Sequence, residues 1–161
     1  MRWLVFLCIS SSSLLAQGDS SIRLSDSFET HIVAINRLLL VADKQIGVPY
    51  VYGGCSPKGF DCSGFIKYCY QISLNRTIPH RSIEISQMGV SVSRQDAIPG
   101  DIVAFTGRSI NGKVAHVGMV YEVSNEAVYF IHSSSSKGIR VDRINSTYWQ
   151  ERFLDIRHIL D

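Results

Sequence analysis

Residues 50–65 read Tyr-Val-Tyr-Gly-Gly-Cys-Ser-Pro-Lys-Gly-Phe-Asp-Cys-Ser-Gly-Phe, a loop rich in turn residues that runs into a helical pattern. The loop ends near Asp61, so Cys62 stands at the start of the predicted helix. A helix start presents unpaired backbone N–H groups and a partial positive charge, and both stabilise a thiolate. The stretch therefore indicates a cysteine nucleophile, provided that a base lies nearby.

Helical periodicity surrounds this loop in the first half of the chain. Apolar residues recur at helical spacing over residues 25–46, where Ser25 or Asp26 suits the start and Gly47 the end. The helix that begins at Asp61 or Cys62 is predicted to run to Gln71 and to be central, with a buried side of Phe65, Ile66, Cys69 and Tyr70. A short helix is predicted over residues 82–88.

The second half of the chain predicts strands instead. Alternating or continuously apolar segments separated by turn residues lie at 101–106, 115–123, 127–133, 139–141 and 152–159. Helices followed by strands with tight turns are typical of an α+β domain, with N-terminal helices packed on a central antiparallel sheet.

Length and composition fit one domain. The chain has 161 residues, and its net charge of +2 is too small to argue for a nucleic-acid partner. Residues 1–16 are typical of a secretory signal peptide, with cleavage near Ala16, although a disordered or amphipathic N-terminus is the alternative. The apolar run is too short to span a membrane. We therefore expect a secreted or periplasmic domain over residues 17–161.

Three cysteines remain after residue 16, so at least one thiol is unpaired. Cys62 and Cys69 would lie about 10 Å apart along one helix, too far for a disulfide. Cys69 is predicted to be a core residue. A bond between Cys55 and Cys62 would inactivate the nucleophile and is the less favoured alternative.

Five histidines are candidate bases, and two stand out. His116 and His132 lie on predicted neighbouring strands, and pairing about the turn at residues 124–126 sets residues near 117 opposite residues near 132. One imidazole can then take the proton of Cys62 while the other orients it. His31 is expected to be a solvated helix residue and His158 to lie on a sheet face, while His80 is ambiguous. The spacing of cysteines and histidines does not favour zinc, and no cofactor is expected.

At these residues the chain resembles the NlpC-type family of cell-wall cysteine peptidases. The resemblance rests on Tyr50-x-Tyr52-Gly53-Gly54 with residues 59–65, on Pro-Gly-Asp-Ile-Val-Ala-Phe at 99–105, and on the strands of His116 and His132. It implies a reduced papain-like α+β fold, with Cys62 as nucleophile, His116 as general base and acid, and His132 as the orienting residue.

The resemblance also implies substrate-binding residues. Tyr50 matches a tyrosine whose hydroxyl lies near the nucleophile, and the backbone N–H of Cys62 would belong to the oxyanion hole. Asp61 and Ser63 match positions that bind a free amine in some members. His80 stands where many members carry Arg, so Arg81 is expected to replace that Arg with a shifted reach.

The function that follows is a monomeric cysteine endopeptidase that hydrolyses peptidoglycan stem peptides through a cysteinyl thioester. The expected bond joins γ-D-glutamate to a diamino acid. Two alternatives stay open: a cell-wall amidase or lipid acyltransferase with the same Cys/His site, and a catalytically silent module that binds cell-wall peptides.

Overall fold

The computed structural model describes the backbone of residues 18–160 and the side chains of residues 28–160. The predicted signal segment, residues 1–16, lies outside the described residues. In chain order the elements are α1 (Gly18–Asp43), β1 (Cys55–Ser56), β2 (Gly59–Phe60), α2 (Cys62–Leu74), α3 (Ser82–Ile85), β3 (Val90–Val92), β4 (Ile102–Thr106), β5 (Val114–Val123), β6 (Val128–Ser134), β7 (Gly138–Arg143), α4 (Thr147–Gln150) and β8 (Phe153–His158). No helix among the described residues is long and apolar enough to cross a membrane.

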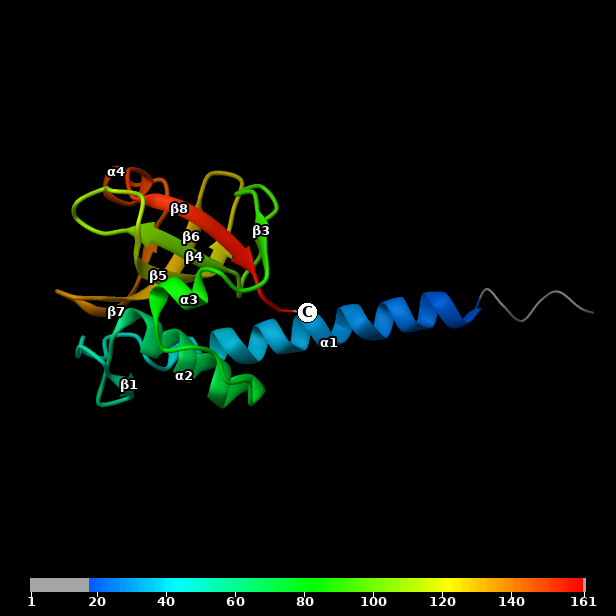
Figure 1. Ribbon diagram of the computed structural model, residues 1–161. Coiled ribbons are helices and arrows are strands. Elements are labelled where there is room, and N and C mark those ends of the chain that lie inside the picture. Colours follow the sequence, from blue (N-terminus) through cyan, green and yellow to red (C-terminus); the bar gives the residue numbers. More distant parts are fainter. Residues whose placement is uncertain (1–17, 161) are drawn as a thin grey trace, which may run out of the picture.

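A six-stranded antiparallel sheet in the order β3-β8-β4-β5-β6-β7 forms the centre of the fold. Helices α1 and α2 lie on one side of it and α4 on the other (Figure 1). The strand β4 is buried on both faces: Ile102 and Ala104 pack with the helices, whereas Val103 and Phe105 pack with the aromatic cluster around Trp149. This burial explains the continuous apolar run of β4. The α+β prediction is confirmed.

Helix α1 differs from its predicted boundaries. It is already helical at Gly18 and ends at Asp43. The backbone N–H of Gly47 then donates to the oxygen of Ile139, and the N–H of Ile139 donates to the oxygen of Val48, which draws the chain toward β7. Among the residues of α1 whose side chains are described, Ile35, Leu38 and Ala42 pack in the core, while the N-terminal part of the helix extends past the sheet (Figure 1). Phe28, one of the apolar residues at helical spacing, is 65% exposed.

Helix α2 begins where the sequence predicts and runs three residues beyond Gln71. Asp61 caps it, because its Oδ1 accepts a hydrogen bond from the backbone N–H of Gly64 at 2.6 Å. Asn75 ends the helix in the left-handed conformation. A Cβ at Gly64 would collide with the backbone oxygen of Gly54, so glycine lets the loop lie directly against the first turn of α2.

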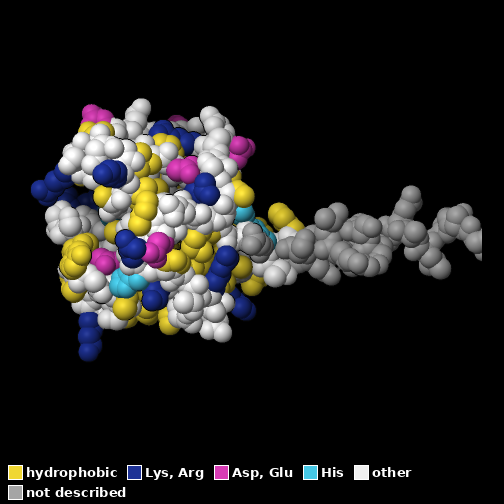
Figure 2. Space-filling model, viewed as in Figure 1, with side chains coloured by type: hydrophobic (Ala, Val, Ile, Leu, Met, Phe, Trp, Pro, Cys, Tyr) yellow, Lys and Arg dark blue, Asp and Glu magenta, His cyan; other side chains and the backbone are white. Residues whose placement is uncertain are grey.

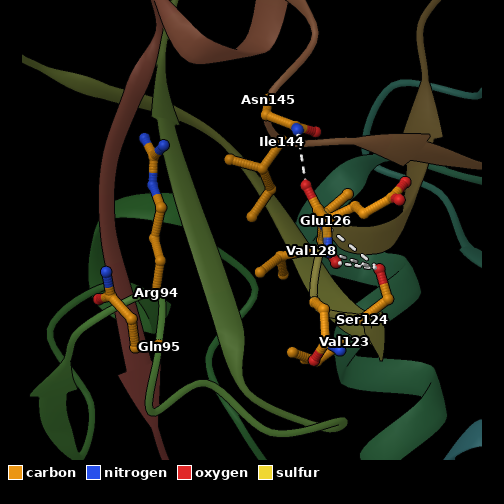
Figure 3. A pocket seen from close by; sticks show the side chains of 10 residues that line it. Arg94, Gln95, Val123, Ser124, Glu126, Val128, Ile144 and Asn145 are labelled. Carbon is orange, nitrogen blue, oxygen red and sulfur yellow. Dashed lines mark hydrogen bonds between the residues drawn. The ribbon is translucent and has the colours of Figure 1, made fainter.

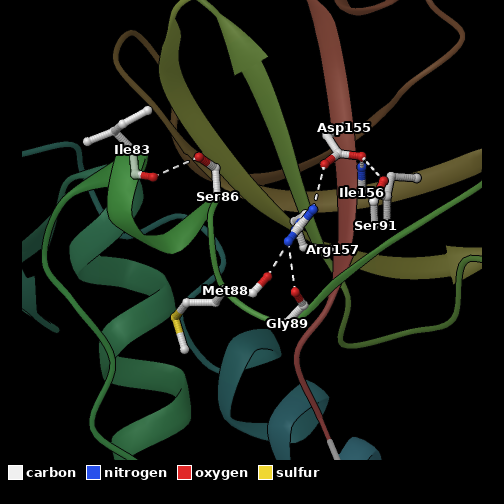
Figure 4. Close-up of polar contacts among 8 residues, drawn as sticks. All are labelled: Ile83, Ser86, Met88, Gly89, Ser91, Asp155, Ile156 and Arg157. Atoms are coloured by element: carbon white, nitrogen blue, oxygen red, sulfur yellow. Dashed lines mark hydrogen bonds and ion pairs between the residues drawn. The ribbon is translucent and has the colours of Figure 1, made fainter.

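The five predicted strands are all present, and the predicted helix over 82–88 shortens to α3. Strand β3 was not predicted, because it is a three-residue exposed edge strand without a clear alternation. Arg157 on β8 fixes the chain between α3 and β3: its guanidinium donates to the backbone oxygens of Met88 and Gly89 (Figure 4). Ser91 on β3 also donates to Asp155 on β8. These contacts tie the segment that follows α3 to β8.

Charged side chains are mixed on the face shown in Figure 2, where lysines and arginines lie among aspartates and glutamates. This agrees with the small net charge of +2.

Candidate active site

Cys62, His116 and His132 line one pocket of about 840 Å³, together with Tyr50 and Trp149. Cys62 belongs to the core cluster between the helices and the sheet. The two histidine rings instead contact Trp149, which packs against the core cluster on the opposite face of the sheet. The pocket therefore lies where the two halves of the core meet. Within the described part of the chain, no group of three His, Cys, Asp or Glu side chains could hold a metal ion.

Cys62 is the first residue of α2, and only 9% of its surface is exposed. Its Sγ lies 3.4 Å from the hydroxyl oxygen of Ser82, the first residue of α3. Burial raises the pKa of the Cys62 thiol, although the contacts with Ser82 and the backbone N–H of Val117 partly offset that rise. The helix start alone suggested a stabilised thiolate, but burial outweighs it, so the resting side chain is a neutral thiol.

His116 on β5 and His132 on β6 meet as the hairpin predicts, with His116 Nε2 and His132 Nδ1 3.0 Å apart. Met119 pairs with Ile131, which fits the predicted pairing of residues near 117 with residues near 132, and a bulge separates Val120 from Glu122. Gly118 allows this approach, since a Cβ there would lie 2.6 Å from Cδ2 of Phe130. The result is a direct contact between two imidazoles in the pocket wall.

Both imidazoles are held neutral. Burial, reinforced by the neighbouring His132, lowers the pKa of His116 to about 3. Although one edge of its ring reaches the pocket, the rest is enclosed by Phe105, His132 and Trp149. Burial likewise lowers the pKa of His132, against the opposing hydrogen bond with Asp142. His116 is therefore an unprotonated base at neutral pH.

Asp142 on β7 is a site residue that the sequence analysis did not identify. Its Oδ2 lies 3.1 Å from His132 Nε2 and accepts a hydrogen bond from Trp149 Nε1 at 3.1 Å, while Arg140 contacts Oδ1 at 2.5 Å. Burial would raise the pKa of Asp142, but the hydrogen bonds from His132 and Trp149 and the charge of Arg140 hold it below its usual range. The sequence did carry a signal: the turn after Ser134 brings β7 beside His132.

Tyr50 lies in the pocket as expected. A parallel bridge between Tyr50 and Phe60 sets its backbone beside the strand that leads into Cys62. Burial raises the pKa of the Tyr50 hydroxyl, followed by the proximity of Cys62 and Asp61. The phenol therefore remains a hydrogen-bond donor at neutral pH.

The other predicted substrate-binding residues do not line the pocket. Asp61 Oδ1 accepts from the backbone of Gly64 and from the Ser63 hydroxyl, and Oδ2 accepts from the backbone N–H of Gly53. Ser63 is buried. The Arg81 side chain is 71% exposed and pairs with Glu84. The side chains of these three residues are thus engaged by local partners or buried, and none of them lines the pocket.

The ambiguous His80 lies beside the cap of α2, with Nε2 3.4 Å from Asp61 Oδ1. His158 lies on β8, as predicted, and contacts Asp101. His31 lies on α1 and is partly exposed, with its ring 5.6 Å from that of His158. Cys55, Cys62 and Cys69 are all free, and Cys69 is buried as predicted.

A second pocket of about 500 Å³ lies at the turn between β5 and β6, where Asn145 donates to the backbone oxygen of Glu126 (Figure 3). Arg94 lies along its other side (Figure 3), with its guanidinium over the ring of Phe153. This pocket shares no lining residue with the one at Cys62.

Comparison with known proteins gives consistent matches. A model of the NlpC/P60 family matches residues 47–158. "Probable endopeptidase NlpC" of Escherichia coli K12 is 36% identical over 85% of this chain and 83% of its own length. "Murein DD-endopeptidase MepS/Murein LD-carboxypeptidase" of the same strain is 33% identical over 88% of this chain and 73% of its own length.

"Gamma-DL-glutamyl hydrolase" of Bacillus subtilis is 35% identical over 72% of this chain, which spans 27% of that longer protein. Among solved structures, an NlpC/P60 family protein from Bacillus cereus superposes with a TM-score of 0.69 at 30% identity. That match covers 79% of this chain and 40% of the solved one.

Proposed function

The chain belongs to the NlpC/P60 family and is a peptidase, and from that premise we propose that it hydrolyses peptidoglycan stem peptides. The proposed bond joins γ-D-glutamate to the diamino acid, in keeping with the name of the γ-DL-glutamyl hydrolase among its relatives. Because peptidoglycan lies outside the cytoplasm, the proposal includes export after removal of residues 1–16, which leaves residues 17–161 as a single secreted or periplasmic domain.

In the proposed mechanism Cys62 is the nucleophile and His116 the base. As the thiol attacks the amide carbonyl, its proton passes to His116, which then gives that proton to the leaving amine. Water next attacks the thioester with His116 as base, so the acid leaves and the Cys62 thiol is restored. Neutral resting states of both groups support proton transfer in step with attack, without a preformed ion pair.

His132 is proposed to orient His116 through the 3.0 Å contact between their rings. Tyr50 and the backbone N–H of Cys62 are proposed to bind the oxyanion, supported by the place of Tyr50 in the pocket wall. Asp61 and Ser63 are proposed to act through the first turn of α2, where they already bond one another. The role proposed for Arg81 in substrate binding receives no support from its contacts.

One observation supports the substrate most directly: the cysteine–histidine pocket has a cationic wall. Arg108, Lys137, Arg140 and Arg143 line it, against the single carboxylate of Asp142, which Arg140 already pairs. A glutamate linked through its γ-carboxyl keeps its α-carboxylate free, so a stem peptide brings negative charge next to the bond to be cut. Such charge would be attracted by this wall.

The test is digestion of purified peptidoglycan by wild type and Cys62→Ala, followed by mass analysis of the released muropeptides. We expect wild type alone to release fragments that end at γ-D-glutamate. Cys55→Ala is the matched control, because Cys55 is exposed and lies outside the pocket lining, and it should keep full activity.

Other products would separate the alternatives. Loss of D,D-cross-links without cuts at γ-D-glutamate would keep the peptidase and change the bond. Release of an acyl chain or of intact stem peptides would favour the acyltransferase or amidase. Binding without cleavage by wild type would favour the silent module and contradict the proposal.

A further inference from the structure

We propose that Asp142 is a positioning residue that sets, through His132, which ring nitrogen of His116 is free to take the proton of Cys62. The inference deepens the proposed function and rests on His116 as the base. It starts from a line of contacts that runs from Arg140 and Trp149 through Asp142 and His132 to His116. Each contact in this line is a hydrogen bond with one donor and one acceptor. Once the donor is known at the Asp142 end, the donor and acceptor of every other contact follow.

The end at Asp142 is fixed because its two other neighbours can only donate. Arg140 Nη2 contacts Oδ1, and Trp149 Nε1 contacts Oδ2. Neither a guanidinium nor an indole N–H can accept a hydrogen bond. Asp142 must therefore present acceptors at both oxygens, which is the behaviour of an ionised carboxylate.

The direction then passes through both imidazoles. Facing an acceptor at Oδ2, His132 must carry its proton on Nε2, so that its Nδ1 is a lone pair. Facing that lone pair at 3.0 Å, His116 must carry its proton on Nε2. His116 Nδ1 is then the unprotonated nitrogen, in the pocket that Cys62 also lines. These tautomers are assigned from the hydrogen-bond network.

The surroundings of His132 restrict the orientation of its ring. Its side chain is 1% exposed, so water has scarcely any access to replace its partners. Its ring stacks on Phe130 at 4.8 Å and meets the edge of Trp149 at 5.0 Å. A ring held on these sides keeps the positions of both nitrogens, and Trp149 itself stacks on His116 at 5.3 Å.

Asp142→Asn tests the direction while keeping the shape. Arg140 should claim the new amide oxygen, because a charge-assisted hydrogen bond is stronger than that of an indole. The amide NH₂ would then face His132 and donate to Nε2, which reverses the tautomers of both rings and places a proton on His116 Nδ1. Adding Arg140→Met removes that bias, so the amide can turn its oxygen back toward His132 and Trp149.

The first measurement is the tautomer itself, by long-range ¹H–¹⁵N NMR of ¹⁵N-histidine protein near neutral pH. Wild type should show Nε2–H for both His116 and His132, and Asp142→Asn should show Nδ1–H for both. This readout needs no substrate, so it stays informative if wild type fails to cut peptidoglycan. In that case the proposed function fails and the tautomer assignment stands.

The second measurement is turnover on peptidoglycan fragments. Asp142→Asn should lower kcat by about 10²-fold with little change in KM. This loss is smaller than the roughly 10⁴-fold loss seen when the replaced aspartate bonds the histidine base directly, because Asp142 acts through His132. The double variant Asp142→Asn with Arg140→Met should have a higher kcat than Asp142→Asn alone. Asp96→Asn, which changes an exposed carboxylate that accepts from Ser93 and lies outside the lining of the Cys62 pocket, is the matched control and should keep wild-type kcat.

The inference is overturned by Nδ1–H on His116 in wild type, which can be read even if a variant fails to fold. It is also overturned if Asp142→Asn folds and keeps both Nε2–H tautomers, or if the double variant turns over no faster than Asp142→Asn. Each of these results would leave Asp142 with a packing role only.

Discussion

The Cys62 Sγ atom and the Ser82 hydroxyl oxygen lie 3.4 Å apart, although the two residues begin different helices. The contact lowers the pKa of the thiol against the larger effect of burial. The position of α3, which Arg157 secures through the following segment, thus bears on the reactivity of the cysteine.

Ser82→Ala should slow alkylation of Cys62 by iodoacetamide at pH 7.5 roughly 5-fold, as expected for one hydrogen bond of about 1 kcal/mol. Removing the hydroxyl raises the pKa of Cys62 further, so less thiolate is present. Peptide mass mapping separates Cys62 from the exposed Cys55. Ser86→Ala, which removes a hydroxyl bonded to Ile83 in the same region (Figure 4), should leave the rate unchanged. An equal rate in both variants would contradict the role of Ser82.

Activity should depend little on pH between 8 and 5. A base with the ordinary pKa of about 6.5 would be about 97% protonated at pH 5 and would lose about 30-fold in kcat/KM. His116, with a pKa of about 3, stays unprotonated over this range. We expect less than about a two-fold change in kcat/KM, after the protein is confirmed to be folded at each pH. An acid limb near pH 6.5 would show that His116 is not held neutral.

Stability, in contrast, should fall over the same range. The pKa of His116 is lower in the folded protein than in the unfolded chain, so its contribution is complete above about pH 6.5 and is lost as pH falls toward 3. From pH 7.5 to 5 the free energy of unfolding should decrease by up to about 2 kcal/mol from this group. Urea unfolding measures it, and His116→Gln should flatten the slope. If His116→Gln keeps the wild-type dependence of the free energy of unfolding on pH, another group causes the loss of stability.

The cationic pocket wall predicts a charge dependence of binding. Lys137→Glu or Arg143→Glu should raise KM for an acidic stem peptide by about 3- to 10-fold at low salt, since exposed ion pairs are worth up to about 1 kcal/mol and reversal adds repulsion. The difference in KM should shrink in 0.5 M salt, because salt screens charges that are exposed to solvent. Lys44→Glu, exposed at the end of α1, is the control. Equal KM values in all variants would remove this support for the substrate.

Much of the site could be predicted from the chain because its parts are local. Asp61 and Gly64 lie within one turn of Cys62, so the cap of α2 needs no distant partner. His116 and His132 sit on one hairpin, whose turn brings them together even though the bulge after Val120 shifts the register. Alternation and spacing are enough to predict such features.

Other parts depend on contacts between distant segments. Asp142 belongs to the site because β7 and α4 place Arg140 and Trp149 against its two carboxylate oxygens. The exposure of Phe28 depends on how far α1 runs past the sheet, which its own periodicity does not encode.

The sequence by itself determined the candidate nucleophile at a helix start, the pair of histidines on one hairpin and the α+β class, because helix caps and hairpins are set by neighbours along the chain. Only the tertiary structure decided the protonation states. Burial of Cys62 and His116 keeps both neutral, and the donor-only neighbours of Asp142 fix the direction of the hydrogen bonds. Burial and electrostatic surroundings are properties of the packed molecule, so no local pattern contains them.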